Sequence, residues 1–189
     1  MGEEGRGTGR GGRKREGTSL LECVVSASLL AVLFSVAAAS LLVSQRVIKR
    51  EEKRQEGLMV AFKVAQTLLT FPFDHLPPEK FSGKGGLLTL KLSFPPLDEK
   101  IQAFDEKGKE ISVRFEGGRE VKVHLDQPLS LFIQYTASWE EKGWKVKVWG
   151  EFVDEGLRRS ETPTDLKGVF VQVEKDDLIC PTLWFLRGR

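Results

Sequence analysis

The most constraining feature of this sequence is a run of 22 residues without a charge, from Cys23 to Ser44 (CVVSASLLAVLFSVAAASLLVS). A helix of that length covers about 33 Å, enough to cross the hydrocarbon core of a bilayer. A core helix of a soluble domain is normally shorter and has a polar face. Serines do not interrupt such a helix, because their hydroxyls can bond to the carbonyl one turn back. We therefore expect this segment to enter a membrane.

Positive charge is concentrated just before the run. Residues 1–17 contain five Lys or Arg and three Glu, so their net charge is +2, and the rest of the chain is neutral overall. The body of the protein therefore has no excess of positive charge for binding nucleic acid. The Gly- and Arg-rich flank lacks the aromatic side chains that stack on RNA bases. We interpret it as a basic membrane flank rather than an RNA-binding tail.

Three interpretations of the apolar run are open. A cleavable secretory signal would have this basic flank and could be cut after Ala39, although apolar residues continue beyond that point to Val43. An uncleaved signal anchor would hold a soluble domain at the membrane. Neither interpretation gives a reason for Glu22, an acid at the edge of the run, where an ionised carboxylate is costly.

The third interpretation rests on the residues around Glu22. The stretch GTSLLE, which follows a basic flank and opens the apolar run, resembles the cleavage motif of type IV prepilins and of the pseudopilins of type II secretion. In that family a short basic leader ends in glycine, and a glutamate occupies the fifth position of the mature chain. The resemblance implies that residues 1–17 are the leader, that a prepilin peptidase cuts between Gly17 and Thr18, and that Thr18 is then N-methylated.

The resemblance also implies roles for the charged residues. Arg13, Lys14 and Arg15 would hold the leader at the anionic cytoplasmic surface. Glu22 would serve filament assembly, by pairing with the new amino group of a neighbouring subunit. This chain departs from the family pattern in having Thr18 where Phe or Met is usual, and in lacking a proline within the apolar helix.

The same residues have a second interpretation that needs no filament. SLLE fits the S-x-x-E capping box, in which Ser19 and Glu22 satisfy unpaired backbone N–H groups at a helix start. Both roles are compatible. The number of Lys and Arg residues does not orient the span, because five lie on each side of it.

The resemblance implies a structural protein of the inner membrane, a minor pilin or pseudopilin with one span and a periplasmic or extracellular head. Its partners would be a prepilin peptidase, other pilin or pseudopilin subunits and the inner membrane. We expect no small-molecule substrate and no cofactor, and DNA only indirectly, in a competence pilus. The alternative is a membrane-anchored periplasmic binding or accessory protein that never polymerises.

The rest of the chain predicts an α+β fold, in which a long N-terminal helix packs on an antiparallel β-sheet head, as in pilins. Apolar residues spaced three and four apart predict a helical stripe that packs on the head, and Pro72 should end the helix. The stripe contains Leu58, Ala61, Phe62, Ala65, Leu68 and Leu69. The predicted regions are the leader (1–17), the span and filament core (18–45), an amphipathic stalk (46–71), a loop (72–86) and the β head (87–189).

Period-two alternation predicts the strands of the head. In REVKVHL, Val121, Val123 and Leu125 should face the core, while Lys122 and His124 face solvent. Short glycine-containing connections predict an antiparallel meander. The predicted strands are LLTLKLSF, EISVRFE, REVKVHL, LSLFIQYTASW, GWKVKVWGEF and KGVFVQVE. The apolar C-terminal tail DDLICPTLWFLRGR is interpreted either as a final strand or as a segment that docks on a neighbour.

No catalytic site is predicted. His75 and His124 are far apart in the sequence, and no metal-ligand spacing, phosphate loop or nucleophile motif occurs. Cys23 and Cys180 are too few for a disulfide framework, and we expect both to be unpaired. We therefore predict that the protein is not an enzyme and holds no metal.

Overall fold

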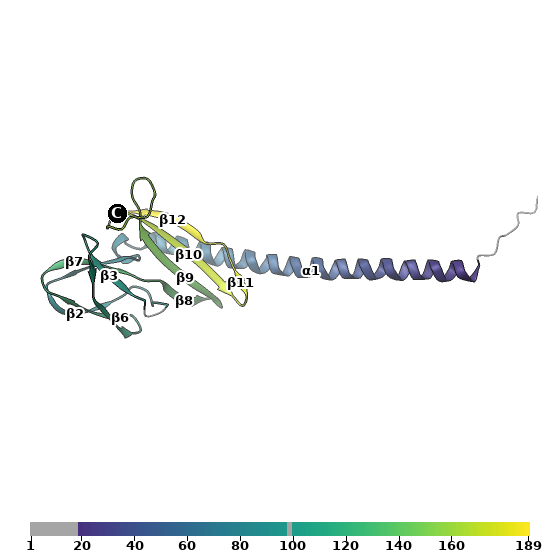
Figure 1. The fold of residues 1–189 in the computed structure, drawn as a ribbon, viewed down its shortest axis with the longest axis horizontal. Coiled ribbons are helices and arrows are strands. Elements are labelled where there is room, and N and C mark those ends of the chain that lie inside the picture. Colours follow the sequence, from purple (N-terminus) through teal and green to yellow (C-terminus); the bar gives the residue numbers. More distant parts are fainter. Residues whose placement is uncertain (1–18, 98–99) are drawn as a thin grey trace, which may run out of the picture. The chain divides into compact units, whose positions relative to one another are not determined.

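One helix of 51 residues, α1 (Leu20–Thr70), contains the whole apolar run (Figure 1). The structure is a computed structural model that describes residues 19–97 and 100–189. The chain divides into two units at Lys49 and Arg50. We call residues 19–49 the apolar segment and residues 50–189 the head unit. The helix and the antiparallel sheets of the head unit make an α+β fold, as predicted.

The sequence accounts for both ends of α1. Ser19, a favoured N-cap residue, stands directly before its first turn. Leucine and alanine, both strong helix formers, dominate its first half. The helix ends at Thr70, because Pro72 cannot continue it and disfavours the helical conformation of Phe71. The predicted helix end is thus confirmed.

The second half of α1 packs on the head unit through one face. Its buried residues are Gly57, Val60, Ala61, Val64, Ala65 and Leu68. The predicted stripe is therefore only half right: Ala61, Ala65 and Leu68 are buried, whereas Phe62 and Leu69 are 55% and 43% exposed. The buried face is rotated relative to the predicted stripe and includes Gly57, where the helix lies close to β9. A Cβ atom at Gly57 would lie 2.8 Å from the Trp144 ring and closer still to Cys180 Sγ.

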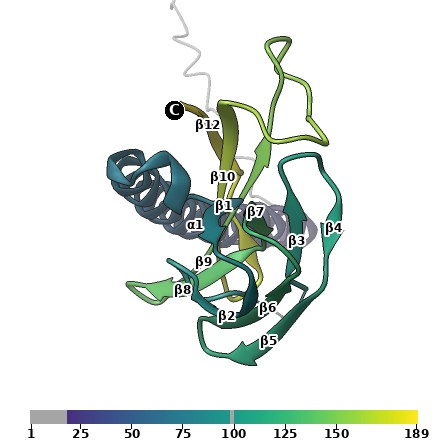
Figure 2. The ribbon, with the colours of Figure 1, turned by 90° about the vertical axis from the view of Figure 1, so that its left-hand side faces the viewer.

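The described part of the head unit contains three sheets, and every strand pair in them is antiparallel (Figure 2). The first has the order β1 (Glu79–Gly83), β7 (Leu129–Gln134), β3 (Gln102–Asp105), β4 (Glu110–Ile111). The second is β11 (Leu178–Ile179), β10 (Leu166–Lys175), β9 (Trp144–Phe152), β8 (Ala137–Glu141), with β12 (Leu183–Gly188) also on β10. The third is β2 (Gly86–Lys91), β6 (Glu120–Leu125), β5 (Val113–Gly117).

This topology corrects the predicted meander. The stretch predicted as one strand, LSLFIQYTASW, is two strands, and β7 and β8 belong to different sheets. Residues 72–86, predicted as a loop, contain the short 3-10 helix η1 (Phe73–His75) and β1. Strand β1 pairs with β7, about fifty residues further along the chain, so local sequence patterns could not indicate the pairing. Strand β3 was not predicted either.

Other expectations for the strands are confirmed. Val121, Val123 and Leu125 of β6 are buried, while His124 is exposed and Lys122 is half-buried. The C-terminal tail forms β12, which pairs with β10 from Leu183 to Gly188. The first of its two interpretations, a final strand, therefore holds. Cys180 is buried and, like Cys23, unpaired.

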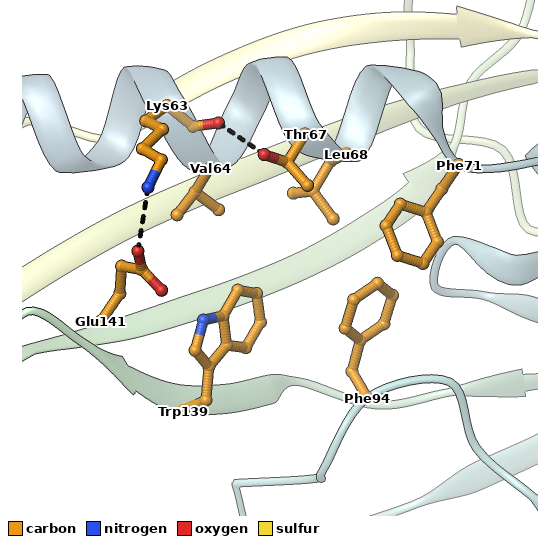
Figure 3. A pocket seen from close by; sticks show the side chains of 8 residues that line it. All are labelled: Lys63, Val64, Thr67, Leu68, Phe71, Phe94, Trp139 and Glu141. Carbon is orange, nitrogen blue, oxygen red and sulfur yellow. Dashed lines mark hydrogen bonds and ion pairs between the residues drawn. The ribbon is translucent and has the colours of Figure 1, made fainter.

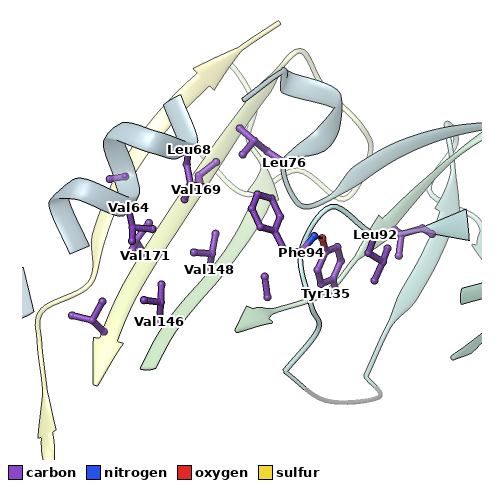
Figure 4. Close-up of a cluster of buried hydrophobic side chains, with 14 of the residues drawn as sticks. Val64, Leu68, Leu76, Leu92, Phe94, Tyr135, Val146, Val148, Val169 and Val171 are labelled. Atoms are coloured by element: carbon purple, nitrogen blue, oxygen red, sulfur yellow. Dashed lines mark hydrogen bonds between the residues drawn. The ribbon is translucent and has the colours of Figure 1, made fainter. Parts of the chain in front are cut away.

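A core of valines joins α1 to the second sheet (Figure 4). Val64 and Leu68 of α1 lie against Val169 and Val171 of β10. Burying such side chains is worth about 1.5–3 kcal/mol each, so this contact stabilises the head unit. The same cluster continues through Leu76, Leu92 and Tyr135 to the valines of β6.

Candidate membrane and assembly segment

Most of the predicted processing residues lie outside the described part of the chain. Gly17 and Thr18, the predicted cleavage site, precede the first described residue, Ser19. The basic leader residues Arg13, Lys14 and Arg15 do so as well. Their roles stay predictions.

Glu22, the predicted assembly residue, lies in the first turn of α1 and is exposed. Its backbone N–H donates to Ser19 Oγ at 3.2 Å. The N–H groups of Glu22 and Cys23 also reach the Ser19 carbonyl, at 2.9 and 3.1 Å. Ser19 is therefore the N-cap of the helix, as the capping interpretation predicted.

The other half of the capping box is absent from the described structure. Among residues 19–97 and 100–189, the Glu22 carboxylate has no hydrogen bond and no ion pair. A negative charge in the first turn interacts favourably with the helix dipole, typically by 0.3–1 kcal/mol. The carboxylate itself remains available to a group outside the described chain.

The apolar segment has no tertiary partners within the described chain. Every residue from Leu20 to Lys49 is exposed, including Leu33, Phe34 and Leu41, whose exposed fractions are 64%, 72% and 65%. The hydroxyls of Ser28 and Ser35 donate to the carbonyls of Val24 and Ala31, both at 2.8 Å. The segment is long and apolar enough to cross a membrane.

The head unit contains a buried carboxylate that the sequence analysis missed. Glu79 in β1 is 1% exposed. It accepts hydrogen bonds from the Ser93 N–H at 2.9 Å, from Ser93 Oγ at 3.0 Å and from the Tyr135 hydroxyl. Burial raises the pKa of Glu79, and hydrogen bonds from Tyr135 and Ser93 oppose the rise. These bonds tie β1 to the loop after β2 and to the corner between β7 and β8.

A buried lysine holds the chain that follows α1. Lys167 in β10 is 0% exposed, and its ammonium donates to the carbonyls of Phe73, Leu76 and Pro78 at 2.7, 2.9 and 2.6 Å. Burial lowers the pKa of Lys167 to about 7. Three carbonyls match the three N–H bonds of the charged form and so favour it. Lys167 thus fixes the turn between α1 and β1 on the second sheet.

The alternation of buried and exposed residues along a strand gives a sequence signal for both Lys167 and Glu79. Lys167 has the same parity as Val169, Val171 and Val173, so alternation places it on the buried face of β10. Glu79 shares the parity of Phe81, which packs on the core. The signal is weak, because Glu79 begins its strand and Lys167 is the second residue of its strand.

An apolar hollow of about 280 Å³ lies between the C-terminal part of α1 and β8 (Figure 3). Phe71, Phe94 and Trp139 form its wall, with Phe94 stacked on Trp139 at 5.6 Å between ring centres. An ion pair between Lys63 Nζ and Glu141 Oε1, 3.3 Å long, bridges its rim. This lining suits an apolar contact rather than chemistry on a substrate.

His75 and His124 are not brought together as a catalytic pair. His75 Nδ1 lies 3.2 Å from Ser93 Oγ, whereas His124 lies 3.7 Å from Asp126 on an exposed surface. In the described ranges no three His, Cys, Asp or Glu side chains cluster as metal ligands would. No known protein family, curated protein or solved structure matches this chain.

Proposed function

We propose that this protein is a minor pilin or pseudopilin, a low-abundance subunit that joins or primes a filament drawn from the inner membrane. A prepilin peptidase would remove residues 1–17, and the head unit would lie on the periplasmic side. Two features support the proposal: the GTSLLE motif after a basic flank, and a long apolar helix joined to an antiparallel β head. The pilin-like character of the fold is part of the proposal.

The observation that carries the proposal is the state of the apolar segment. Its helix is exposed on all sides, and its single acid, Glu22, has no partner among the described residues. Exposed apolar surface of this extent needs a bilayer or other chains to cover it. In a plain membrane anchor the acid would serve only the helix dipole, whereas a filament subunit would also give its carboxylate a charged partner.

Cleavage would create the partner for Glu22. Removal of residues 1–17 would free an α-amino group on Thr18. In members of the pilin family this amino group is then methylated. The carboxylate of one subunit can pair with that amine on a neighbour as the helices leave the bilayer. At 4 Å and an effective dielectric constant of 20, the attraction is about 4 kcal/mol, and desolvation offsets much of it. The pair therefore sets the register between subunits more than it adds stability.

Substitution of Glu22 tests this role. Glu22→Gln keeps the helix and its Ser19 cap but removes the charge. We expect normal insertion, normal cleavage and loss of the subunit from sheared or purified filaments. Glu52→Gln, at an exposed acid further along α1, is the matched control and should be incorporated normally. Incorporation of Glu22→Gln at the wild-type level would remove Glu22 from the assembly role.

One observation favours a second candidate, a membrane-anchored periplasmic binding or accessory protein that does not polymerise. The Ser19 cap satisfies the helix start within the chain, so a simple anchor can begin at this residue without help from a filament. The two candidates differ in processing. An anchor remains uncut, and a filament subunit begins at Thr18.

A further inference from the structure

Three basic residues follow the apolar run on one face of α1. Arg46, Lys49 and Arg50 are spaced three and four residues apart, so they lie along one side of a single helical turn. All three are exposed. None of them has a hydrogen bond or an ion pair among the residues that the structure describes.

The next two basic residues of the helix differ in this respect. Lys53 Nζ lies 3.7 Å from Asp176 Oδ2, and Arg54 Nη1 lies 3.8 Å from Glu51 Oε2. The helix therefore has two kinds of cation. Those nearest the apolar run have no partner among the described residues, and those further along lie near a carboxylate of the chain.

If the apolar run spans a bilayer, the distance of each cation from the end of the run explains why the two kinds differ. The last uncharged residue of the run is Ser44. At 1.5 Å per residue, Arg46, Lys49 and Arg50 lie about 3 to 9 Å beyond it along the helix. The headgroup layer on each side of a bilayer is about 5–7 Å thick. Long basic side chains reach back toward that layer, whereas Lys53 and Arg54 begin about 13 Å out.

We propose that Arg46, Lys49 and Arg50 form a binding surface for the headgroups of anionic phospholipids in the leaflet on the head side. The phosphate of such a lipid supplies the negative charge that these three cations lack within the described chain. Juxtamembrane basic clusters bind anionic lipids in this way, and each cation strengthens the attraction about fivefold. The inference rests on the membrane span, and goes beyond the proposed filament role.

The proposed surface should select one class of lipid and should fix the depth of the helix in the bilayer. Phosphatidylglycerol carries a net negative charge, and phosphatidylcholine carries none, so the surface should select the first over the second. The apolar segment would then be held at a fixed depth, because the cations resist both burial in the hydrocarbon core and removal from the headgroups.

Spin-labelled lipids test the inference directly. The full chain is reconstituted in vesicles of phosphatidylcholine and phosphatidylglycerol (4:1), and electron paramagnetic resonance gives the relative association of each labelled lipid with the protein. Wild type should prefer labelled phosphatidylglycerol, and the preference should fall with added salt. The triple variant Arg46→Gln, Lys49→Gln, Arg50→Gln should lose that preference by a factor of about two or more.

The matched control removes three exposed charges of the head unit instead, two from the turn between β3 and β4 and one from β5. Lys107→Gln, Lys109→Gln and Arg114→Gln change the net charge equally and should leave the lipid preference unchanged. The triple variant should still insert, because removing basic residues on the head side favours the same orientation. An unchanged preference in the triple variant, or none in wild type, would overturn the inference.

The result is independent of the filament proposal. The leader is the same in wild type and in the triple variant, so any lipid that it attracts cancels in the comparison. A triple variant that loses lipid preference yet begins at Thr18 supports both proposals. An uncut wild-type chain with a strong preference supports this inference and contradicts the filament role.

Discussion

The apolar segment exposes every side chain from Leu20 to Lys49, whereas the head unit buries even a lysine and a glutamate. In the head unit, Lys167 and Glu79 are tolerated in the core because carbonyls and hydrogen-bond donors of the same chain satisfy them. In the apolar segment, the Glu22 carboxylate and the cations Arg46 and Lys49 have no such partner within the described chain.

This difference in burial indicates where each region obtains its stability. The head unit folds on its own contacts, so its substitutions should change its unfolding free energy. In the proposed function the apolar segment depends on a bilayer or other chains, so its substitutions should change insertion or assembly and leave the head unit unaffected. All four tryptophans lie in the head unit, so tryptophan fluorescence of the full chain in detergent micelles reports on that unit alone.

The largest expected effect is at Lys167. Lys167→Met keeps the volume but removes the donor to the carbonyls of Phe73, Leu76 and Pro78. Leaving buried acceptors unsatisfied costs about 1–3 kcal/mol each, so we expect the unfolding free energy to fall by about 3 kcal/mol. Urea unfolding followed by tryptophan fluorescence measures it. Lys109→Met, at an exposed position, should change it by less than about 0.5 kcal/mol, and equal effects would contradict this role.

The lowered pKa of Lys167 predicts that the unfolding free energy depends on pH. Burial lowers the pKa of Lys167 to about 7 from an unfolded value near 10.5, against the attraction of Asp74 and Glu79. Between these values the folded chain has released a proton that the unfolded chain still binds. Stability should therefore rise from pH 7 to pH 10, by at most about 1.4 kcal/mol per pH unit. The rise should be absent in Lys167→Met, and an identical rise in both proteins would contradict it.

A smaller effect is expected at Gly57. Alanine is favoured over glycine in a helix by up to about 1 kcal/mol, yet its Cβ would collide with Trp144 and Cys180. We expect Gly57→Ala to lower the unfolding free energy by about 1–3 kcal/mol. Gln55→Ala, an exposed neighbour, should not.

A second substitution sharpens this result. Cys180→Ala removes the sulfur nearest the new methyl group. The double variant should therefore lose less unfolding free energy than the two single variants lose in sum. Additive losses would show that α1 does not approach the sheet as closely as described.

The smallest expected effect belongs to the apolar segment. Ser19→Ala removes the hydroxyl that accepts from the Glu22 N–H, although the carbonyl acceptor remains, and should weaken the first turn by about 1 kcal/mol. Amide hydrogen exchange of Glu22 and Cys23 in micelles should become faster, while urea unfolding of the head unit stays the same. Unchanged exchange would contradict the cap, and a less stable head unit would contradict the separation of the two regions.

The sequence predicts best those features that depend on neighbouring residues. Charge-free length indicated a helix long and apolar enough to cross a membrane, the S-x-x-E spacing indicated the Ser19 cap, and alternation indicated the buried face of β6. These signals are local, so one stretch of chain suffices to read them. The position of Glu22 in the first turn of α1 followed from the same stretch.

Features that depend on distant parts of the chain were missed. The first sheet forms because β1 and β3 both pair with β7, and no local pattern specifies those partners. The stripe on α1 was misplaced because its register is set by Trp144 across from Gly57. The sequence analysis did not single out Lys167 and Glu79, since the carbonyls and donors that satisfy them come from other segments.

We propose that the apolar segment finds its partners outside its own chain, first in a bilayer and then in a filament. Identification of the first residue of the mature protein tests this proposal most directly. The protein is recovered from cell membranes, and its N-terminal peptide is sequenced by mass spectrometry. We predict a chain that begins at Thr18, with a methyl group on its amine. A chain that retains residues 1–17, or that begins at Ser40, would contradict it.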